Sequence, residues 1–534
     1  MKQEPISDSL DVLVIGAGFA GLYMLYKLRN LGFSAKAVDS ATDVGGTWYW
    51  NRYPGARCDV DSMFYAYSFD EELEQEWEWT ERYPSQPEIL SYANHVADRF
   101  NLRSHIIFDT KIISAKYHDN AKKWYISSEK GDKFEVAFCI MATGCLSIMN
   151  KPKLNGVENF SGRIFYTGEW PHETINFTNR KVGILGTGSS GVQVIPQVAK
   201  QAKDLFVFQR TPSYVVEAFN RPLGSEEQKS IKQNYKTLRA SAKETFGGFA
   251  MNTNDQSALS VTEKECHDRL EKGWRFGGIG LLASYNDFGT NAKANARAQN
   301  FVRSKISDIV KDQNTAQRLM PDHIIGCKRL CLGTNYFESY NRKNVSLIPL
   351  EKGGIEGFTR TGVIVNGTEY LIHDFIFATG FDAMTGALNR VEIQGRENKL
   401  LKKAWGAGPK TYLGLMTNGF PNLFMITGPG SPSVLSNMMP TIEHHVEWIA
   451  DCLVYLREND ITEIEATLEA QEAWVEHGNR IASQTLRYEC NSWYLGANIP
   501  GKPRIFMPYI GGMPSYREKC SAVAAAAYTG FSLN

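Results

Sequence analysis

Two clusters of glycines share the spacing Gly-x-Gly-x-x-Gly, and each follows a short apolar run. The first comprises Gly16, Gly18, Phe19 and Gly21, and the second comprises Gly186, Thr187, Gly188, Ser189, Ser190 and Gly191. Glycines at this spacing allow a tight turn from a strand into a helix, where a pyrophosphate approaches the helix N-terminus. One cluster alone could equally serve close helix packing, whereas two such clusters predict two dinucleotide sites.

The residue that ends the next apolar stretch differs between the two clusters. Asp39 follows the first cluster, and Arg210 with Thr211 follows the second. A carboxylate accepts hydrogen bonds from ribose hydroxyls, whereas a guanidinium suits a ribose that carries a 2′-phosphate. We therefore expect FAD at the first site and NADPH at the second.

Apolar runs and turns indicate the elements that hold these clusters. We expect a helix over residues 22–31 and strands over 34–39, 123–128, 134–141 and 375–377. Ala-Thr-Gly turns follow the last two strands at Ala142 and Ala378, which suggests two crossovers between domains. The predicted fold is α/β with two Rossmann-like domains, in which the NADP domain is inserted into the FAD domain.

The predicted domain boundaries follow from these crossovers. Residues 1–145 and 381–534 would form the two parts of the FAD-binding domain, and residues 146–380 would form the NADP-binding domain. Polar helical patterning over about 221–321, with a capping box from Thr262 to Glu265, indicates a helical insertion in the second domain.

Composition restricts the classes of partner. The chain has 534 residues with 58 basic and 58 acidic side chains, so nothing in the overall charge favours nucleic acid or a membrane surface. The polar stretch from Met1 to Leu10 has no apolar signal segment, and no apolar run approaches about 18 residues. We expect a cytoplasmic protein, as a monomer, with a homo-oligomer left open.

The cysteines and histidines offer no chemistry of their own. Nine cysteines are present without a Cys-x-x-Cys pair, which predicts reduced thiols in a reducing compartment and argues against a disulfide reductase. No metal is predicted, because no histidine spacing is typical of a metal site.

Two further segments are rich in aromatic and turn-forming residues. Residues 45–59 read Gly-Gly-Thr-Trp-Tyr-Trp-Asn-Arg-Tyr-Pro-Gly-Ala-Arg-Cys-Asp, and residues 160–171 read Phe-Ser-Gly-Arg-Ile-Phe-Tyr-Thr-Gly-Glu-Trp-Pro. Each could be an aromatic-lined turn in the core. Together, however, they resemble the signature motifs of Baeyer-Villiger monooxygenases, and segments 208–212, 428–433 and 498–503 extend the resemblance over nearly the whole chain. The departure is Tyr166, which stands at the family's histidine position.

The resemblance implies the reaction and the cofactors. It implies an NADPH- and O2-dependent flavin monooxygenase that inserts one oxygen atom next to a ketone carbonyl, through a flavin C4a-peroxide, and gives an ester or lactone. Aromatic or cyclic ketones are the expected substrates. A flavin monooxygenase that oxidises sulfur or nitrogen is the alternative, and Tyr166 leaves open a non-catalytic redox sensor.

A basic pair, Lys328-Arg329, lies within an apolar run and suggests the site of reaction. Arginine keeps its charge where lysine can lose it, so Arg329 is the candidate for stabilising an oxyanion. Asp59 would orient and partly neutralise it, because a buried cation without a partner is unfavourable. If the segment is extended, the two side chains point oppositely, and Lys328 can reach the 2′-phosphate beside Arg210.

The remaining site residues follow from the resemblance. Those expected to contact FAD are Gly46, Thr47, Trp48, Asp59, Tyr65 and Met438; those expected to contact NADP are Arg57, Lys328, Arg329 and Trp493. Ser433, Val434, Leu435 and Met438 match the loop that shapes the ketone pocket. Each aromatic residue could instead be core packing.

Overall fold

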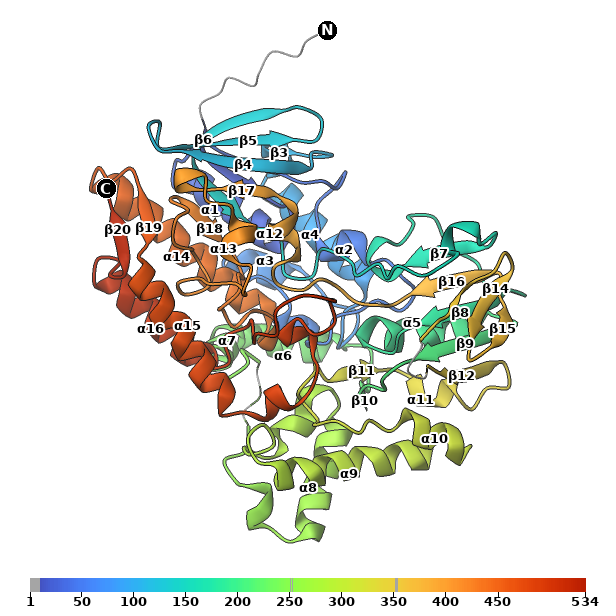
Figure 1. The fold of residues 1–534 in the computed structure, drawn as a ribbon. Coiled ribbons are helices and arrows are strands. Elements are labelled where there is room, and N and C mark those ends of the chain that lie inside the picture. Colours follow the sequence, from blue (N-terminus) through green and yellow to red (C-terminus); the bar gives the residue numbers. More distant parts are fainter. Residues whose placement is uncertain (1–9, 250, 252, 351–353) are drawn as a thin grey trace.

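The computed structural model describes residues 10–249, 251, 253–350 and 354–534, so nearly all of the polar N-terminal stretch lies outside the described residues. Figure 1 shows two sheets side by side. A helical lobe, with α8 (Glu263–Phe276), α9 (Ala292–Ile309) and α10 (Gln313–Leu319), lies below them, and the C-terminal helices α15 (Leu468–Ser483) and α16 (Met513–Ala525) lie on the left. Mixed helices and largely parallel sheets confirm the predicted α/β class.

The first sheet has eight strands, in the order β17-β4-β5-β6-β1-β2-β3, with β18 paired to β6. They are β1 (Leu10–Ile15), β2 (Ala35–Val38), β3 (Ile106–Ile107), β4 (Ile112–His118), β5 (Lys123–Ser128), β6 (Lys133–Met141), β17 (Glu392–Gln394) and β18 (Leu423–Met425). β1 runs parallel to both β2 and β6, while β4, β5 and β6 form an antiparallel meander. Strands from both ends of the chain thus share one sheet.

Helices cover this first sheet. α1 (Phe19–Asn30) follows β1 and packs against α14 (Met438–Glu458), which comes from the far end of the chain. The predicted helix over 22–31 therefore exists but begins three residues earlier. The other helices that complete this part are α2 (Thr47–Trp50), α3 (Glu71–Glu76), α4 (Gln86–Arg99), α12 (Gly386–Arg390), α13 (Leu401–Ala404), α15 (Leu468–Ser483) and α16 (Met513–Ala525), with the hairpin of β19 (Ile464–Ala466) and β20 (Phe531–Leu533).

The second sheet is a separate five-stranded sheet, in the order β12-β9-β8-β16-β7, and all its pairs are parallel. Its strands are β7 (Arg163–Tyr166), β8 (Lys181–Leu185), β9 (Asp204–Gln209), β12 (Val345–Pro349) and β16 (Asp374–Phe377). α5 (Ser189–Ala199) and α11 (Tyr336–Ser339) pack beside it, and a small antiparallel sheet is formed by β13 (Gly357–Phe358), β14 (Gly362–Val365) and β15 (Thr368–Leu371).

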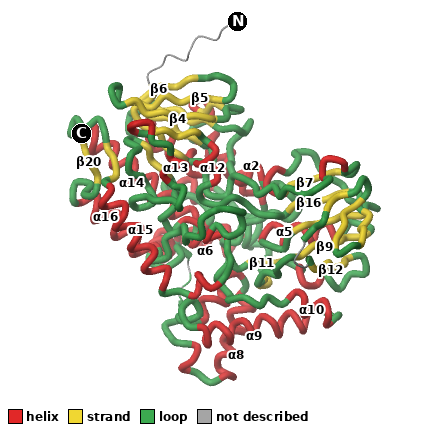
Figure 2. Tube along the Cα trace, viewed as in Figure 1, coloured by secondary structure: helices red, strands yellow, loops and turns green. Residues whose placement is uncertain are grey.

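Helices dominate the segment between the two halves of the second sheet, as Figure 2 shows in red. They are α6 (Ser225–Gln233), α7 (Tyr235–Lys243), α8 (Glu263–Phe276), α9 (Ala292–Ile309) and α10 (Gln313–Leu319). The predicted capping box is present at the start of α8, where Thr262 and Glu265 exchange hydrogen bonds. A short parallel pair, β10 (Val215–Glu217) with β11 (Cys331–Gly333), flanks this segment and places residues 328–329 directly before β11.

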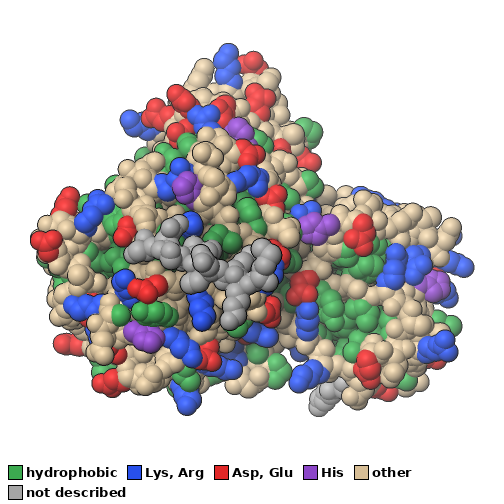
Figure 3. Space-filling model, turned by 90° about the horizontal axis from the view of Figure 1, so that it is seen from above, with side chains coloured by type: hydrophobic (Ala, Val, Ile, Leu, Met, Phe, Trp, Pro, Cys, Tyr) green, Lys and Arg blue, Asp and Glu red, His purple; other side chains and the backbone are tan. Residues whose placement is uncertain are grey.

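Acidic and basic side chains are intermixed on the face seen in Figure 3, as the balanced composition would suggest. Among the described residues, no helix is long and apolar enough to cross a membrane.

Candidate functional site

One cavity of about 1600 Å³ extends along both glycine turns and reaches the loop between α10 and β11. Ligand pockets for one small molecule measure roughly 300–1,000 Å³, so this cavity has room for more than one ligand. The predicted residues in its wall are Gly16, Gly18, Phe19, Asp39, Gly46, Thr47, Trp48, Arg57, Asp59, Tyr65, Gly186, Thr187, Gly188, Ser189, Ser190, Arg210, Thr211, Lys328, Arg329, Val434, Met438 and Trp493. Gly21, Gly191, Ser433 and Leu435 lie outside it.

The third glycine of each cluster serves packing. A Cβ on Gly21 would lie 1.8 Å from the carbonyl oxygen of Gly16, and one on Gly191 would lie 2.2 Å from that of Gly186. These glycines therefore let α1 and α5 start directly against the turns that precede them.

The second glycines face different surroundings. A Cβ on Gly18 would lie 3.3 Å from Cα of Gly46, whereas one on Gly188 would meet nothing within 4 Å among the described residues. Each residue directly precedes a helix, and the first residues of both helices line the cavity. The open space beside Gly188 suits a phosphate group at a helix N-terminus.

Asp39 has a structural role as well as a place in the wall. Its Oδ2 accepts a hydrogen bond from the Ala17 N–H at 2.6 Å, and its Oδ1 accepts one from the Ala41 N–H at 2.8 Å. Burial raises the pKa of Asp39, while these two N–H groups oppose that rise. Each carboxylate oxygen keeps a further lone pair for a ribose hydroxyl.

Basic side chains gather at the other end of the cavity. Arg210, Thr211 and Lys328 all line it there. Burial, and then the charge of Arg210, lower the pKa of Lys328. Asp322, whose side chain is 95% exposed, opposes this shift, but the two cations still favour an anionic ligand with more than one charge.

Arg329 bridges three segments in the middle of the cavity. Its Nε donates to Asp59 Oδ2 at 2.6 Å and its Nη2 donates to Asp59 Oδ1 at 2.8 Å, while Nη1 donates to the Val434 carbonyl at 2.6 Å. Burial alone would raise the pKa of Asp59, but the charge and hydrogen bonds of Arg329 lower it below its ordinary value. A guanidinium has five N–H donors, so two remain for a ligand in the cavity.

Comparison with known proteins matches this arrangement. The flavin-binding monooxygenase-like family matches residues 10–224. The chain is 41% identical over 528 residues to a Baeyer-Villiger monooxygenase of Pseudooceanicola batsensis, covering 98% of this chain and 96% of that protein. The chain belongs to the Baeyer-Villiger monooxygenase family.

Other relatives of the present chain carry names for different reactions. It is 41% identical to a cyclohexanone 1,2-monooxygenase of an Acinetobacter species, covering 98% of this chain and 96% of that protein. It is also 39% identical to a phenazine N-monooxygenase of Lysobacter antibioticus, covering 98% and 97%.

Solved structures of similar proteins have the same fold. A steroid monooxygenase bound to NADP superimposes with a TM-score of 0.95 at 46% identity, covering 98% of this chain and 99% of that one. OTEMO, solved in complex with FAD and NADP, superimposes with a TM-score of 0.95 at 37% identity, covering 99% and 100%.

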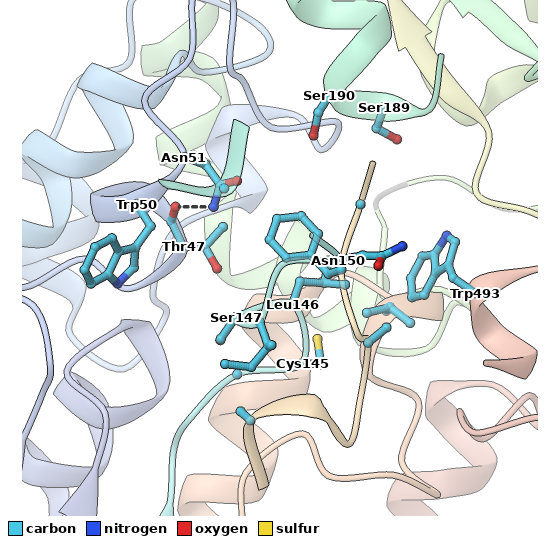
Figure 4. A pocket seen from close by; sticks show the side chains of 18 of the residues that line it. Thr47, Trp50, Asn51, Cys145, Leu146, Ser147, Asn150, Ser189, Ser190 and Trp493 are labelled. Carbon is cyan, nitrogen blue, oxygen red and sulfur yellow. Dashed lines mark hydrogen bonds between the residues drawn. The ribbon is translucent and has the colours of Figure 1, made fainter. Parts of the chain in front are cut away.

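The aromatic motif of this Baeyer-Villiger monooxygenase folds into one wall of the cavity. Trp48 Nε1 donates to the Tyr65 hydroxyl at 3.0 Å, and Asn51 Nδ2 donates to the Thr47 carbonyl at 2.8 Å. Figure 4 shows Thr47, Ser189, Ser190 and Trp493 around one hollow, although they come from distant parts of the chain. These aromatic side chains both pack and line the site, so the two interpretations of the motif are compatible.

Arg57 already has a protein partner. Its Nη1 donates to Glu81 Oε2 at 2.8 Å and to the Tyr83 carbonyl at 2.9 Å, and its side chain is 23% exposed. Nearby, the Tyr53 hydroxyl donates to Gln193 Oε1 of α5 at 2.7 Å. The motif therefore joins the two sheets' helices as well as lining the cavity.

The loop predicted to shape a ketone pocket contributes unevenly. Val434 and Met438 lie in the wall, whereas the Ser433 hydroxyl is buried against the Met384 sulfur at 3.9 Å. Leu435 packs against the apolar cluster behind the wall. Only part of this loop can therefore touch a ligand directly.

Tyr166, at the end of β7, does not line the cavity. Its ring stacks on Phe377 with centroids 4.9 Å apart, and Lys151 Nζ lies 5.0 Å from its centroid. A tyrosine can thus occupy the family's histidine position as a packed side chain between β7 and β16.

The prediction that every cysteine is a reduced thiol was wrong. Cys327 and Cys490 form a disulfide across a separation of 163 residues, whereas the other seven cysteines are free and buried. Sequence spacing could not reveal this pair, because the loops meet only through the tertiary fold. The bond ties the residue before Lys328 to the loop that carries Trp493.

Several wall residues were not predicted. They include Cys145, Leu146 and Asn150, which follow the first Ala-Thr-Gly turn, and Asp322 and His323, which precede the basic pair. The position of the turn at the end of β6 was a usable signal for the first group, because ligands bind at the carboxyl ends of parallel strands. Within the described residues, no three His, Cys, Asp or Glu side chains gather as a metal site.

Proposed function

We propose that this protein uses FAD, NADPH and O2 to convert a ketone into an ester or lactone and water. FAD would lie along Gly16, Gly18, Asp39, Gly46 and Trp48, and NADPH along Gly188, Arg210 and Lys328. The observation that carries the proposal is the placement of Arg329 in one continuous cavity with both glycine clusters. The open space beside Gly188 and the cations near Arg210 fit the second cofactor.

When bound, the flavin supplies electron transfer from NADPH and the activation of O2. Arg329 would contribute a permanent positive charge, and the two N–H donors that its contacts with Asp59 and Val434 do not use could stabilise an oxygen that gains negative charge. Asp59 holds that guanidinium by two hydrogen bonds and fixes its plane. The Val434 carbonyl fixes its third nitrogen, so the cation is positioned before the substrate arrives.

The substrate would lie against the apolar wall beside Arg329. Val434, Met438, Leu146 and Trp493 line this region, and the buried side chains behind it form one apolar cluster. A wall of this kind favours the binding of ketones with an aromatic or cyclic body and disfavours the binding of water. Discrimination between such ketones would be modest, because one methylene is worth about 1–3 kcal/mol in an apolar pocket.

Two measurements on the purified holoenzyme test this proposal. Anaerobic mixing with NADPH should bleach the flavin spectrum, and aerobic turnover with phenylacetone or cyclohexanone should give the ester or the lactone, with one NADPH consumed per product. Reduction without oxygenated product from a broad panel of ketones, amines and sulfides would reject an oxygenase function.

Oxidation of nitrogen or sulfur is the second candidate. The observation that favours it is the 39% identity to a phenazine N-monooxygenase over nearly the whole chain. The same turnover assay separates the candidates, because N-oxides or sulfoxides would form from amines or sulfides while ketones remained unchanged. A preference for ketones supports the first candidate.

We also propose that residues 1–145 and 381–534 form the FAD-binding domain, and that residues 146–380 form the inserted NADP-binding domain. The first sheet draws its strands from residues 10–141 and 392–425, and the second from 163–377, which supports these boundaries. A monomeric state and a cytoplasmic location remain predictions. The disulfide makes the location worth testing, since disulfides are uncommon in a reducing cytosol.

A further inference from the structure

His323 lies at the basic end of the cavity, in the loop between α10 and β11. It lines the wall together with Arg210 and Lys328, and its side chain is 12% exposed. Its Nδ1 is buried and has no hydrogen-bond partner among the residues that the structure describes. A buried ring nitrogen without a partner is unfavourable, so the structure offers this nitrogen little stabilisation in the absence of a ligand.

Contacts hold His323 in this position. The Tyr214 hydroxyl donates to its carbonyl oxygen at 2.8 Å, and the two rings meet edge to face with centroids 5.2 Å apart. Two residues earlier, the Pro321 carbonyl accepts hydrogen bonds from Arg303 of α9 at 2.9 and 2.7 Å. The loop that brings His323 into the cavity wall is therefore anchored.

The charges around His323 are mostly positive. Burial, followed by the charge of Lys328, lowers its pKa to about 4, and Arg303 acts in the same direction. Asp322 opposes them, but its Oδ1 is 3.9 Å from Nδ1 and its side chain is 95% exposed. Arg210, which faces Lys328, adds positive charge at the same end. At neutral pH the imidazole is thus uncharged.

We propose that His323 is a further ligand of the 2′-phosphate of NADPH, and that it takes up a proton when this phosphate binds. A phosphate carries nearly two negative charges near pH 7. Placed among Arg210, Lys328 and His323, it would outweigh the positive charge that keeps the imidazole neutral and would favour the imidazolium. The inference rests on the proposed NADPH site.

The proposed role has a definite consequence for cofactor choice. NADH has no 2′-phosphate, so its binding gives His323 no reason to gain a proton. The preference for NADPH over NADH should therefore increase as the pH falls from 8 toward 6.5, where proton uptake becomes easier and the phosphate is still largely charged. Arg210 and Lys328 alone would give no such proton uptake, provided that they stay protonated.

Calorimetric titration of the FAD-loaded enzyme at pH 7.5 tests the proposal without turnover. The probes are 2′,5′-ADP, which carries the 2′-phosphate, and 5′-AMP, which lacks it. Titration in two buffers with different ionisation enthalpies measures the protons taken up. For the wild type we expect net uptake with 2′,5′-ADP and none with 5′-AMP.

Variants make the test specific for His323. In His323→Gln we expect the affinity for 2′,5′-ADP to fall about tenfold or more, as for a lost hydrogen bond to a charged group, and the proton uptake to disappear. His118→Gln, an exposed histidine on β4, should behave as the wild type. Unchanged affinity and proton uptake in His323→Gln would overturn the inference while leaving the NADPH site intact. If the wild type does not prefer 2′,5′-ADP over 5′-AMP, the cofactor assignment itself fails.

Discussion

Arg329 and Asp59 form a bidentate ion pair, with Nε–Oδ2 at 2.6 Å and Nη2–Oδ1 at 2.8 Å, although 270 residues separate them in the chain. The pair joins the aromatic motif of the first sheet's domain to the segment that enters β11. Their side chains are 24% and 26% exposed, through the cavity that both line. The cation is thus held in place by the protein and still accessible to a ligand.

Replacement of Arg329 by alanine should separate the two half-reactions. NADPH should still reduce the flavin, because the second glycine cluster is untouched. Ester formation should fall by about 10²–10³-fold, or roughly 3–4 kcal/mol, as when one oxyanion donor is removed. Stopped-flow reduction and product analysis by gas chromatography measure the two effects.

Arg329→Lys controls for the charge. Lysine can carry the positive charge, although it loses a proton more easily than arginine, and it cannot make the planar bidentate contact with Asp59, so we expect an intermediate rate. Ester formation by Arg329→Ala at the wild-type rate would contradict the assigned role, provided that both variants retain flavin and melt as the wild type does.

The ion pair should also affect stability in a pH-dependent manner. The pKa of Asp59 is lowered in the folded protein, so its contribution is fully present above the ordinary pKa of about 3.9 and is lost as the pH falls through the lowered value. Breaking such a pair costs about 3–5 kcal/mol when it is buried, and partial exposure favours the lower end. Thermal melting of Asp59→Asn should therefore differ most from the wild type near pH 7 and least at the lowest pH at which both fold.

Asp61→Asn is the matched control for that experiment. Asp61 pairs with Arg82 at 2.6 Å; the Asp61 side chain is 43% exposed, against 26% for Asp59, although that of Arg82 is 12% exposed. Exposed pairs contribute about 0–1 kcal/mol, so this variant should melt close to the wild type. An equal loss in both variants would show that Asp59 has no special role.

Local sequence patterns were sufficient to predict much of the fold. An apolar run followed by glycines specified the turns before α1 and α5, and the 3.6-residue spacing specified helices, because these are short-range effects. Helix α1 began earlier than expected, at Phe19, since the helix can start directly at Gly18 when Gly21 allows close contact with Gly16.

Long-range contacts set the limit of prediction for the site. The hydrogen bond from Arg329 to the Val434 carbonyl and the approach of His323 to Lys328 depend on how loops meet across the cavity. The same applies to Cys327 and Cys490, whose pairing has no signature in their spacing. Family resemblance could suggest Arg329 and Asp59, but it gave no indication of His323 or of the disulfide.

Reduction of the Cys327–Cys490 disulfide should weaken NADPH binding. The bond ties the segment of Lys328 and Arg329 to the loop of Trp493. A dithiol reagent reduces the bond to two cysteine thiols and is itself oxidised to a disulfide. We expect a several-fold higher KM for NADPH after reduction, and a loss of about 2–4 kcal/mol in stability. Without reagent, the Cys327→Ser/Cys490→Ser double variant should show the KM of the reduced wild type. Adding the reagent should not change the KM of this variant. An identical response of wild type and variant would assign the effect to other cysteines.

Two glycines in the second cluster should respond differently to the same substitution. In Gly188→Ala the added Cβ meets nothing within 4 Å among the described residues, so the protein should fold as the wild type does, yet the methyl group would occupy the space proposed for a phosphate. In Gly191→Ala the added Cβ would lie 2.2 Å from the Gly186 carbonyl oxygen, so α5 must shift and the melting temperature should fall.

We expect Gly188→Ala to weaken NADPH binding by about tenfold or more, the scale of one lost hydrogen bond to a charged group, with an unchanged melting temperature. Differential scanning fluorimetry and NADP⁺ titration of the two variants provide the comparison. A stable Gly188→Ala variant with wild-type affinity would show that the cofactor does not approach the backbone at this turn.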